Sequence, residues 1–340
     1  MLKAEESPVG YYKLLHQKRE TELFLSAVRV KLFSYMENWK TSRTAAEKTG
    51  LNPRSLSFYL NALACIGLLE KKGDAYRNTV QSNTYLNESS PLYLGKSLLF
   101  REKMMSLHRL DQRLYEGPDC RIAERNQGIE VYDFCEAART GIPEMYAGRV
   151  QALVQASLKL FSSRSPGKIL DLGGGSGVLA IELVSAFPDS KGVVFEAPGV
   201  AEVSKDLISK RNLGQRMEVM EGDFNTDALD GGYDLIIASG IIDFARDHLD
   251  ALMAKLRGAL NPGGYLYLVA HNVSEDYQSP PEAILGWLSS HLDGLDILLT
   301  GKTIEEALAR HGFAFIGSND AGGAFKGLPG SFYKVKEAEL

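Results

Sequence analysis

Apolar residues at helical spacing dominate the first part of the chain. Between residues 11 and 37 they predict one long helix, and residues 41–50 and 52–67 predict two shorter helices. The stretch 68–79 has the alternation and the polar centre of a β-hairpin that turns at 72–74. Helix, turn, helix and hairpin in this order predict a winged helix.

The residue types at helix ends support the two shorter helices. Thr44 and Glu47 have the spacing of a capping box, and Gly50 is placed to end that helix. Asn52 followed by Pro53 is an N-cap with proline at the first helical position. We therefore expect the chain to break between Gly50 and Asn52.

Two longer helical patterns lead into the second half of the chain. Residues 97–114 predict one helix, and residues 143–161 predict another after a loop around Gly117. The stretch 162–167, which contains serine, proline and glycine, is the clearest linker in the sequence.

Past this linker the pattern alternates regularly between strands and helices. The expected helices include 249–260 and 303–310, the second with a Thr303/Glu306 capping box. Seven segments predict strands: 168–172, 192–196, 216–221, 233–239, 265–271, about 313–317 and 331–335. Strands that alternate with helices predict an α/β domain.

The stretch KILDLGGGSG, which opens this domain, is the most informative in the chain. A short apolar strand leads into a glycine-rich turn, which allows a ligand to approach the backbone closely. The pattern D-x-G-x-G-x-G comprises Asp171, Gly173, Gly175 and Gly177. A dinucleotide fingerprint would need glycine or alanine in place of Val178, so the sequence favours a different nucleotide-like ligand.

An acidic residue ends the next predicted strand. Glu196 lies roughly 20 residues past the glycine turn, the distance at which a carboxylate meets a ribose diol in Rossmann-type sites. A solvated strand end would look the same in isolation. The combination of Glu196 with Asp171 favours cofactor binding.

The composition is that of an ordinary globular protein of two-domain size, with 340 residues, 44% of them hydrophobic and 24% charged, and a net charge of −5. Cys65, Cys120 and Cys135 lack C-x-x-C spacing, which predicts neither a metal site nor disulfides. The first residues lack an apolar signal core, and no run of about 18 apolar residues occurs. We therefore expect a cytoplasmic protein with no membrane partner.

A winged helix leaves a DNA-binding regulator as an alternative. Residues 1–90 contain thirteen Lys and Arg against nine Asp and Glu. The second short helix, however, offers only Arg54 as a base-reading cation, whereas direct readout usually needs several polar or basic side chains. We therefore expect no nucleic-acid partner.

The segment from Asp171 to Gly177 resembles motif I of the class I S-adenosylmethionine-dependent methyltransferases. Further stretches extend the resemblance to nearly the whole chain: SRTAAEKTGLNPRSLSFYLNALACIGLL, FEAPGV, EGDFN, YDLIIASGIIDF, LNPGGYLYLV and TIEEALARHGF. In this order they resemble the small-molecule O-methyltransferases of plant phenylpropanoid and bacterial antibiotic pathways.

This resemblance implies a Rossmann-like seven-stranded methyltransferase domain preceded by an all-α winged-helix dimerisation domain. It implies that residues 1–95 dimerise, that 96–162 form a helical linker contributing to the substrate pocket, and that 163–340 bind S-adenosyl-L-methionine. The implied partners are a small aromatic or polycyclic acceptor and a second copy of the chain, without a metal. Apolar residues of the first helices are the expected dimer contacts: Leu23, Phe24, Val28, Leu32 and Phe33.

The resemblance also assigns cofactor binding to residues at or just past the carboxyl ends of the first four predicted strands. These residues are Asp171, Gly173, Gly175, Gly177, Glu196, Ala197, Asp223, Phe224 and Ser239. In the family, the carboxylate at the position of Asp223 accepts from the adenine amino group, and the residue at Phe224 packs on the ring. A turn or helix cap is the alternative role for Asp223.

The sequence departs from the family after the fourth predicted strand. O-methylating members read L-H-D-W there, with the histidine as base, whereas residues 241–244 read IIDF and place Ile242 at the histidine. A general base contributes about 10²–10⁴-fold. Three explanations stay open: an acceptor that ionises unaided or attacks through carbon or sulfur, another base, or chemistry other than methyl transfer. The candidate catalytic residues are His271, expected to end the fifth strand, and Asp243.

Overall fold

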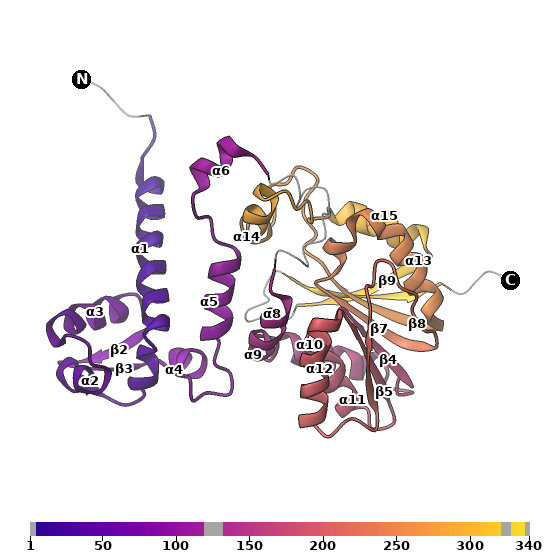
Figure 1. Cartoon of the computed structure of the whole chain (residues 1–340), viewed down its shortest axis with the longest axis horizontal. Coiled ribbons are helices and arrows are strands. Elements are labelled where there is room, and N and C mark those ends of the chain that lie inside the picture. Colours follow the sequence, from indigo (N-terminus) through magenta and orange to yellow (C-terminus); the bar gives the residue numbers. More distant parts are fainter. Residues whose placement is uncertain (1–4, 119–131, 321–327, 337–340) are drawn as a thin grey trace. The chain divides into compact units, whose positions relative to one another are not determined.

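The computed structural model describes residues 5–118, 132–320 and 328–336, so Cys120 lies outside the described residues. The chain forms two compact units, Met1–Phe100 and Arg101–Leu340 (Figure 1). Within the described ranges, no helix is long and apolar enough to cross a membrane.

The first unit is mainly helical and includes a small antiparallel sheet of order β1-β3-β2. Its elements are α1 (Val9–Arg29), the 3₁₀ helix η1 (Leu32–Tyr35), β1 (Lys40–Thr41), α2 (Ser42–Thr49), α3 (Pro53–Cys65), β2 (Leu69–Lys72), β3 (Ala75–Asn78) and α4 (Val80–Leu86). Helix α5 (Gly95–Met104) spans the division between the units. The predicted hairpin is confirmed: β2 pairs with β3 around a turn at Gly73, whose φ is 60°.

The first predicted helix is shorter than expected. Helix α1 ends at Arg29 because Lys31 adopts a left-handed conformation with φ 56°, and the chain continues as η1. This break lets Val28, Leu32 and Phe33 enter the core of the unit, where they pack with Leu60 and other residues of α3.

The expected dimer contacts are therefore wrong in part. Val28, Leu32 and Phe33 are each at most 2% exposed within the core of their own unit, and Leu23 and Phe24 are partly buried against it. The exposed apolar side chains of α1 lie in its first two turns instead. Each is more than half exposed: Val9, Tyr11, Tyr12, Leu14 and Leu15.

Both predicted capping boxes are displaced by three residues. Helix α2 is capped by Thr41, whose hydroxyl accepts from the backbone N–H of Thr44 at 3.3 Å. Helix α15 (Gly301–Arg310) is capped by Thr300, which accepts from the N–H of Thr303 at 3.1 Å. The N-cap predicted at Asn52 is confirmed by its bond to the N–H of Ser55 at 3.0 Å.

The second unit contains the α/β domain. Its strands are β4 (Lys168–Leu172), β5 (Lys191–Glu196), β6 (Met217–Glu221), β7 (Tyr233–Ser239), β8 (Leu260–Val269), β9 (Phe313–Asn319) and β10 (Gly330–Val335). Its other helices are α6 (Leu110–Glu116), α8 (Phe134–Thr140), α9 (Ile142–Met145), α10 (Arg149–Leu160), α11 (Val178–Ala186), α12 (Pro198–Lys210), η2 (Ile242–His248), α13 (Leu249–Ala259) and α14 (Pro281–Leu292).

The seven strands form one sheet of order β6-β5-β4-β7-β8-β10-β9, which confirms the predicted α/β class. Strands β4 to β8 run parallel, and β10 pairs antiparallel with β8 and β9. The chain order reverses at β4, so the carboxyl ends of β4, β5 and β7 border the crevice where such sheets bind ligands. Strand β8 ends at Val269, so His271 lies two residues beyond the strand rather than at its last position.

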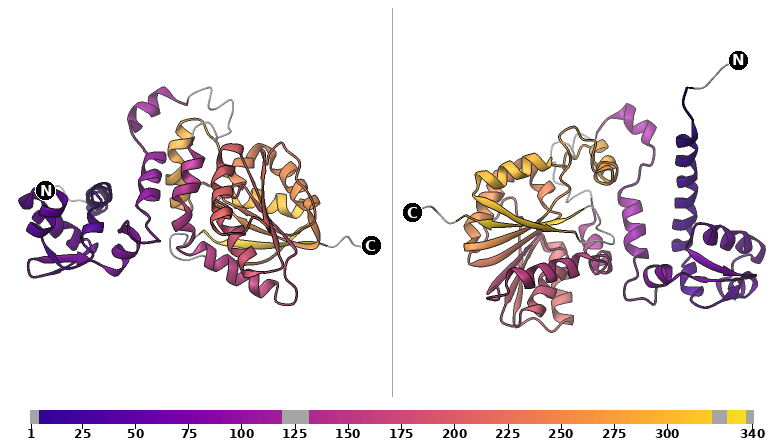
Figure 2. Two further views of the ribbon diagram at one scale, coloured as in Figure 1. Left: turned by 60° about the horizontal axis from the view of Figure 1, so that its bottom comes forward. Right: turned by 180° about the vertical axis from the view of Figure 1, so that it is seen from behind.

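Helices cover both faces of this sheet (Figures 1 and 2), and a hydrophobic core lies between the helices and the sheet on each face. Alternate strand residues point to opposite faces. Leu170 and Ile236 therefore pack with α13 and α15, whereas Ile169 and Leu235 pack with α10 and α11. The helical cover on both faces accounts for the nearly continuous apolar runs in the central strands.

Two predicted helices are each interrupted. The stretch 97–114 forms α5, which ends at Met104, and α6, which begins after Arg109 in a left-handed conformation with φ 54°. The stretch 143–161 is divided between α9 and α10 at Gly148, whose φ of 148° is accessible to glycine.

The displaced caps give a prediction on stability. We expect Thr300→Ala to lower the free energy of unfolding by about 1 kcal/mol, because it leaves a helical N–H without its acceptor. Thr303→Ala should change stability by less, since the Thr303 hydroxyl bonds only the Thr300 hydroxyl within the residues that the structure describes. Urea midpoints of the two variants and the wild type check this. A larger loss of stability in Thr303→Ala than in Thr300→Ala would contradict capping by Thr300 and favour the capping box that the sequence predicts.

Candidate functional site

The turn after β4 places backbone rather than side chains at the sheet edge. Gly173 and Gly175 have φ values of 59° and 58°, a conformation that favours glycine. A Cβ on Gly173 would lie 2.6 Å from Cγ2 of Ile241, so a larger residue would collide with the start of the segment after β7. Ser204 of α12 fixes the turn by donating to the carbonyl of Gly175 at 2.6 Å.

Glu196 joins this turn to the end of β5. Its carboxylate accepts from the N–H of Gly175 at 2.7 Å and from the N–H of Ala197 at 2.8 Å. Burial raises the pKa of Glu196 above its usual value, and the two backbone donors oppose that rise. The carboxylate therefore holds the turn in place while facing the space beside it.

Asp171 and Gly177 support the turn from below rather than facing that space. Asp171 is 1% exposed, and its carboxylate accepts from the N–H of Ala180 in the first turn of α11 at 3.3 Å. Burial is the main cause that raises the pKa of Asp171 to about 7; the hydrogen bond from Ala180 opposes the rise, and the charge of the nearby Glu196 adds to it. Gly177 precedes α11 with φ 71°, and a Cβ there would lie 2.8 Å from Cγ2 of Val194.

A cavity of about 720 Å³ lies outside the carboxyl ends of β4, β5, β6 and β7. Seven of the predicted cofactor-binding residues line it: Gly173, Gly175, Glu196, Ala197, Asp223, Phe224 and Ser239. The structure thus brings together residues from four separate strand ends. Asp171 and Gly177 are not among its lining residues.

Asp223 both lines this cavity and shapes its own loop. Its Oδ1 accepts from the N–H of Asn225 at 2.8 Å, and its own N–H donates to Asp227 at 2.9 Å. Within the described part of the chain, the second carboxylate oxygen of Asp223 makes no hydrogen bond to the loop. The turn-cap alternative and a role at the cavity are therefore compatible.

The polar and aromatic groups that line this cavity fit an adenosyl cofactor. A carboxylate offers about four lone-pair positions, and backbone N–H groups fill two of those on Glu196. The remaining positions can accept both hydroxyls of a ribose. Gly173 and Gly175 leave backbone where a ligand would need close approach, and Phe224 presents a ring in the same cavity.

His271 and Asp243, predicted from separate strand ends, contact each other. Nδ1 of His271 lies 2.7 Å from Oδ2 of Asp243, and Oδ1 of Asp243 accepts from the N–H of Leu299 at 2.9 Å. The Asp243 side chain is almost completely buried, whereas 20% of the His271 side chain is exposed. The other imidazole nitrogen, Nε2, accepts from the indole N–H of Trp287 at 3.1 Å. Among the described residues, the His271 ring is thus bonded to side chains and not to the backbone.

A cluster of aromatic rings connects this pair to the cavity. Tyr132, Phe134 and Phe244 line the cavity, and the edge-on contact between the Phe134 and Phe244 rings has a centroid distance of 5.5 Å. Trp287 of α14 contacts Tyr132, Phe244 and His271 edge-on, with centroids 6.1, 5.8 and 5.8 Å apart. These rings form a flat-sided apolar wall beside the predicted cofactor residues.

Trp287 and Tyr132 were not predicted from the sequence. Trp287 lies in an ordinary helical pattern and Tyr132 lies in no predicted element, so neither has a local signal. Ile242, which the resemblance places at the family's base, is fully buried in the core on the α13 face of the sheet. It is not a residue of the cavity wall.

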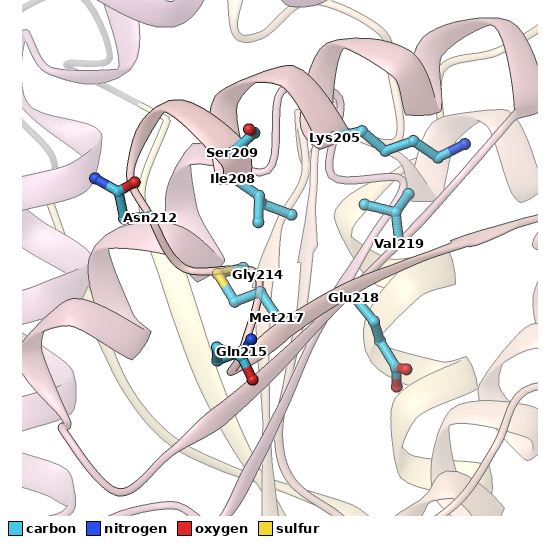
Figure 3. Close-up of a pocket in the computed structure, with 9 residues that line it drawn as sticks. All are labelled: Lys205, Ile208, Ser209, Asn212, Gly214, Gln215, Met217, Glu218 and Val219. Atoms are coloured by element: carbon cyan, nitrogen blue, oxygen red, sulfur yellow. The ribbon is translucent and has the colours of Figure 1, made fainter.

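A second hollow, of about 410 Å³, lies between α12 and β6 (Figure 3). Its lining residues are Lys205, Ile208, Ser209, Asn212, Gly214, Gln215, Met217, Glu218 and Val219. It borders the amino end of β6, whereas ligands of open α/β sheets bind at the carboxyl ends. We therefore assign the site to the larger cavity. Among the described residues, no group of His, Cys, Asp and Glu is arranged to hold a metal ion.

Comparison with known proteins identifies the family. Residues 135–301 match the family model of the O-methyltransferase domain. Acetylserotonin O-methyltransferase of Gallus gallus is 32% identical over 237 residues, which are 65% of this chain and 67% of that protein. The tetracenomycin polyketide synthesis 8-O-methyl transferase TcmO of Streptomyces glaucescens is 28% identical over 271 residues, which cover 78% and 79% of the two chains.

The fold is also that of solved methyltransferases. Human N-acetylserotonin methyltransferase in complex with S-adenosylmethionine superposes with a TM-score of 0.70 at 21% identity, over 99% of this chain and all of that chain. The sequence relatives, the matching domain and the fold agree. The chain belongs to the O-methyltransferase family, whose members transfer a methyl group from S-adenosylmethionine to a small acceptor.

Proposed function

We propose that the protein methylates a hydroxyl group on a flat aromatic molecule, with His271 as the general base. The observation that carries this proposal is the His271–Asp243 pair beside the aromatic rings that line the cavity. A neutral hydroxyl is a poor nucleophile, so a positioned base has a use in O-methylation. An acceptor that attacked without losing a proton would leave the pair without a chemical task.

The cofactor S-adenosylmethionine supplies the methyl group. We propose that Glu196 accepts the ribose hydroxyls, that Asp223 and Phe224 receive the adenine, and that Gly173, Gly175, Ala197 and Ser239 form the remaining backbone wall. Their position in one cavity supports these roles. Asp171 and Gly177 would act indirectly, by holding the turn and the start of α11.

The proton would move along a short path. The acceptor oxygen gains the methyl group, and its proton passes to Nε2 of His271. The Nδ1–H stays on the side of Asp243, whose carboxylate stabilises the cationic imidazole. Asp243 is thus a positioning residue, fixed in turn by the N–H of Leu299.

The names of relatives support an aromatic acceptor. They include acetylserotonin O-methyltransferases and a 3-hydroxy-5-methyl-1-naphthoate 3-O-methyltransferase of Streptomyces sahachiroi. Acetylserotonin and that naphthoate are therefore the first acceptors to assay. Base-free transfer to carbon is the alternative for an acceptor that neither compound represents.

We also propose that the chain is a homodimer. In this proposal, residues 1–95 form a winged-helix dimerisation domain, residues 96–162 form the helical linker, and residues 163–340 bind the cofactor. The exposed apolar side chains at the start of α1 support this, because a row of such residues is typical of an interface.

Cofactor binding should depend on Glu196. We expect Glu196→Ala to weaken S-adenosylhomocysteine binding about 10- to 100-fold, since it removes charged hydrogen bonds to the ribose worth about 1.5–3 kcal/mol. Glu221→Ala is the matched control, because Glu221 ends the neighbouring strand opposite Glu196 but does not line the cavity. Calorimetry measures both. Equal affinities in the two variants would contradict the assignment of the site.

The affinity for S-adenosylhomocysteine should fall as the pH is lowered. Burial raises the pKa of Glu196, and donors from the ribose would lower it again in the complex. Affinity is therefore full above the raised pKa and is lost as the pH falls through it. Calorimetry between about pH 7.5 and pH 5 tests this. Asp171, whose pKa is about 7, could also titrate in this range. We expect Asp171→Asn to show the same loss of affinity at low pH, which would assign the pH dependence to Glu196.

Turnover should depend on His271. We expect His271→Asn to lower kcat about 10²-fold or more with little change in S-adenosylhomocysteine affinity, because asparagine can still donate to Asp243 but cannot take the acceptor's proton. His311→Asn is the control, because His311 also pairs with an aspartate, Asp250, at 3.1 Å, away from the cavity. Formation of S-adenosylhomocysteine from each acceptor is the assay. Unchanged kcat in His271→Asn would favour the base-free alternative.

Oligomeric state should depend on the start of α1. We expect light scattering of the wild type to give about twice the chain mass of 37.4 kDa. Leu14→Glu should shift the measured mass toward that of one chain, because it places a charge among the exposed apolar side chains at the start of α1. Val80→Glu is the control, since Val80 is 83% exposed on α4. A wild-type mass of one chain would overturn the homodimer.

A further inference from the structure

Trp287 determines which nitrogen of His271 carries the proton. An indole N–H can only donate, and it lies 3.1 Å from Nε2, so Nε2 must hold a lone pair. A neutral imidazole then carries its proton on Nδ1, which lies 2.7 Å from Asp243. The ring is thereby fixed as one neutral tautomer by hydrogen bonds at both nitrogens.

The same hydrogen bond occupies the lone pair that a general base needs. His271 is not a lining residue of the cavity, whereas Tyr132 and Phe244, which contact Trp287, are. The indole thus lies between the cavity wall and the imidazole. An acceptor can reach Nε2 from the cavity only after the indole N–H has left it.

The helix that carries Trp287 is held by other contacts. Arg113 donates to the Ser289 carbonyl and pairs with Asp293, and the hydroxyls of Tyr132 and Ser290 share a hydrogen bond. These contacts fix the second half of α14. Release of Nε2 therefore requires a rotation of the indole side chain rather than a displacement of the helix.

We propose that Trp287 is a positioning residue that holds His271 in its proton-accepting tautomer and gives up Nε2 to the hydroxyl of the acceptor. This inference rests on the proposed role of His271 as base. The exchange keeps one donor at Nε2, because the acceptor O–H replaces the indole N–H at the same lone pair. It favours acceptors with an O–H or N–H donor on an aromatic ring and selects against rings without one.

The indole N–H signal of Trp287 tests the first half of the proposal without any turnover. The chain has two tryptophans, and Trp39→Phe leaves Trp287 as the single indole while retaining a ring for Arg77. In a ¹H–¹⁵N spectrum of this variant, we expect adding His271→Asn to move the indole signal upfield, because the acceptor Nε2 is removed. Adding His311→Asn instead should leave it in place. An indole signal that His271→Asn does not move overturns the proposal.

Phenol and toluene test the second half. We expect phenol to move the indole signal toward its position in His271→Asn, because its hydroxyl replaces the indole N–H. Toluene has a ring of similar size without a donor and should leave the signal unchanged. Equal effects of the two compounds, or no effect of phenol, overturn the exchange. In Trp287→Phe, which keeps an aromatic ring, the ¹⁵N signal of Nε2 should move toward that of a free lone pair; an unchanged signal also contradicts the contact.

These outcomes are separable from those of the proposed function. Loss of cofactor binding in calorimetry would refute the methyltransferase site while the indole spectrum stayed as expected. Conversely, normal cofactor binding and turnover with an indole signal insensitive to His271 would refute the role of Trp287 alone.

Discussion

The carboxylate of Glu196 is the contact on which the geometry of the site depends. It accepts from the turn after β4 and from the first residue after β5, so one side chain joins two neighbouring strand ends. Its burial is unfavourable for the charge, and the raised pKa is the consequence. Two backbone donors offset that cost and, in return, the glycine turn is held in shape by Glu196 and by Ser204. The cavity wall is thus formed before a ligand arrives.

The strands and the glycine turn could be predicted because their signals are local. The residue pattern of β4 and β7 matches the structure at both ends, since each is a mostly apolar run, broken only by Asp171 or Asp234, that ends at a glycine turn. Helix starts were less certain for a physical reason. In T-x-x-T-x-x-E, either threonine can cap, and the earlier one adds a turn of helix with its backbone hydrogen bonds. Local sequence does not show which start is used.

Other departures come from conformations and coverage that have no sequence signal. Lys31 and Arg109 adopt positive φ although neither is glycine or asparagine, and each ends or divides a predicted helix. The apolar spacing of residues 23 to 33 correctly indicated an apolar surface, but not what covers it. The break at Lys31 turns Leu32 and Phe33 into the unit's own core, so the expected interface residues became interior ones.

Individual residues of the catalytic region could be predicted from the sequence, but the contacts between them could not. His271 and Asp243 were candidates because each follows a strand, yet their contact joins positions 28 residues apart in the chain. Trp287 joins them from a helix whose pattern has no other distinguishing feature. The resemblance located the missing histidine at Ile242, and that side chain is fully buried in the apolar core. A histidine there would have to bury an imidazole among apolar side chains.

The position of His271 satisfies two requirements at once. Asp243 is almost completely buried, and its Oδ1 is already occupied by the N–H of Leu299, so Oδ2 needs a donor of its own. The Nδ1–H of His271 meets that need whether or not the protein performs proton transfer. The other imidazole nitrogen, Nε2, accepts from the indole N–H of Trp287. Two hydrogen bonds fix the imidazole. Only the one from Trp287 can be replaced by a hydrogen bond from the hydroxyl of the methyl acceptor without leaving the buried Asp243 carboxylate unpaired.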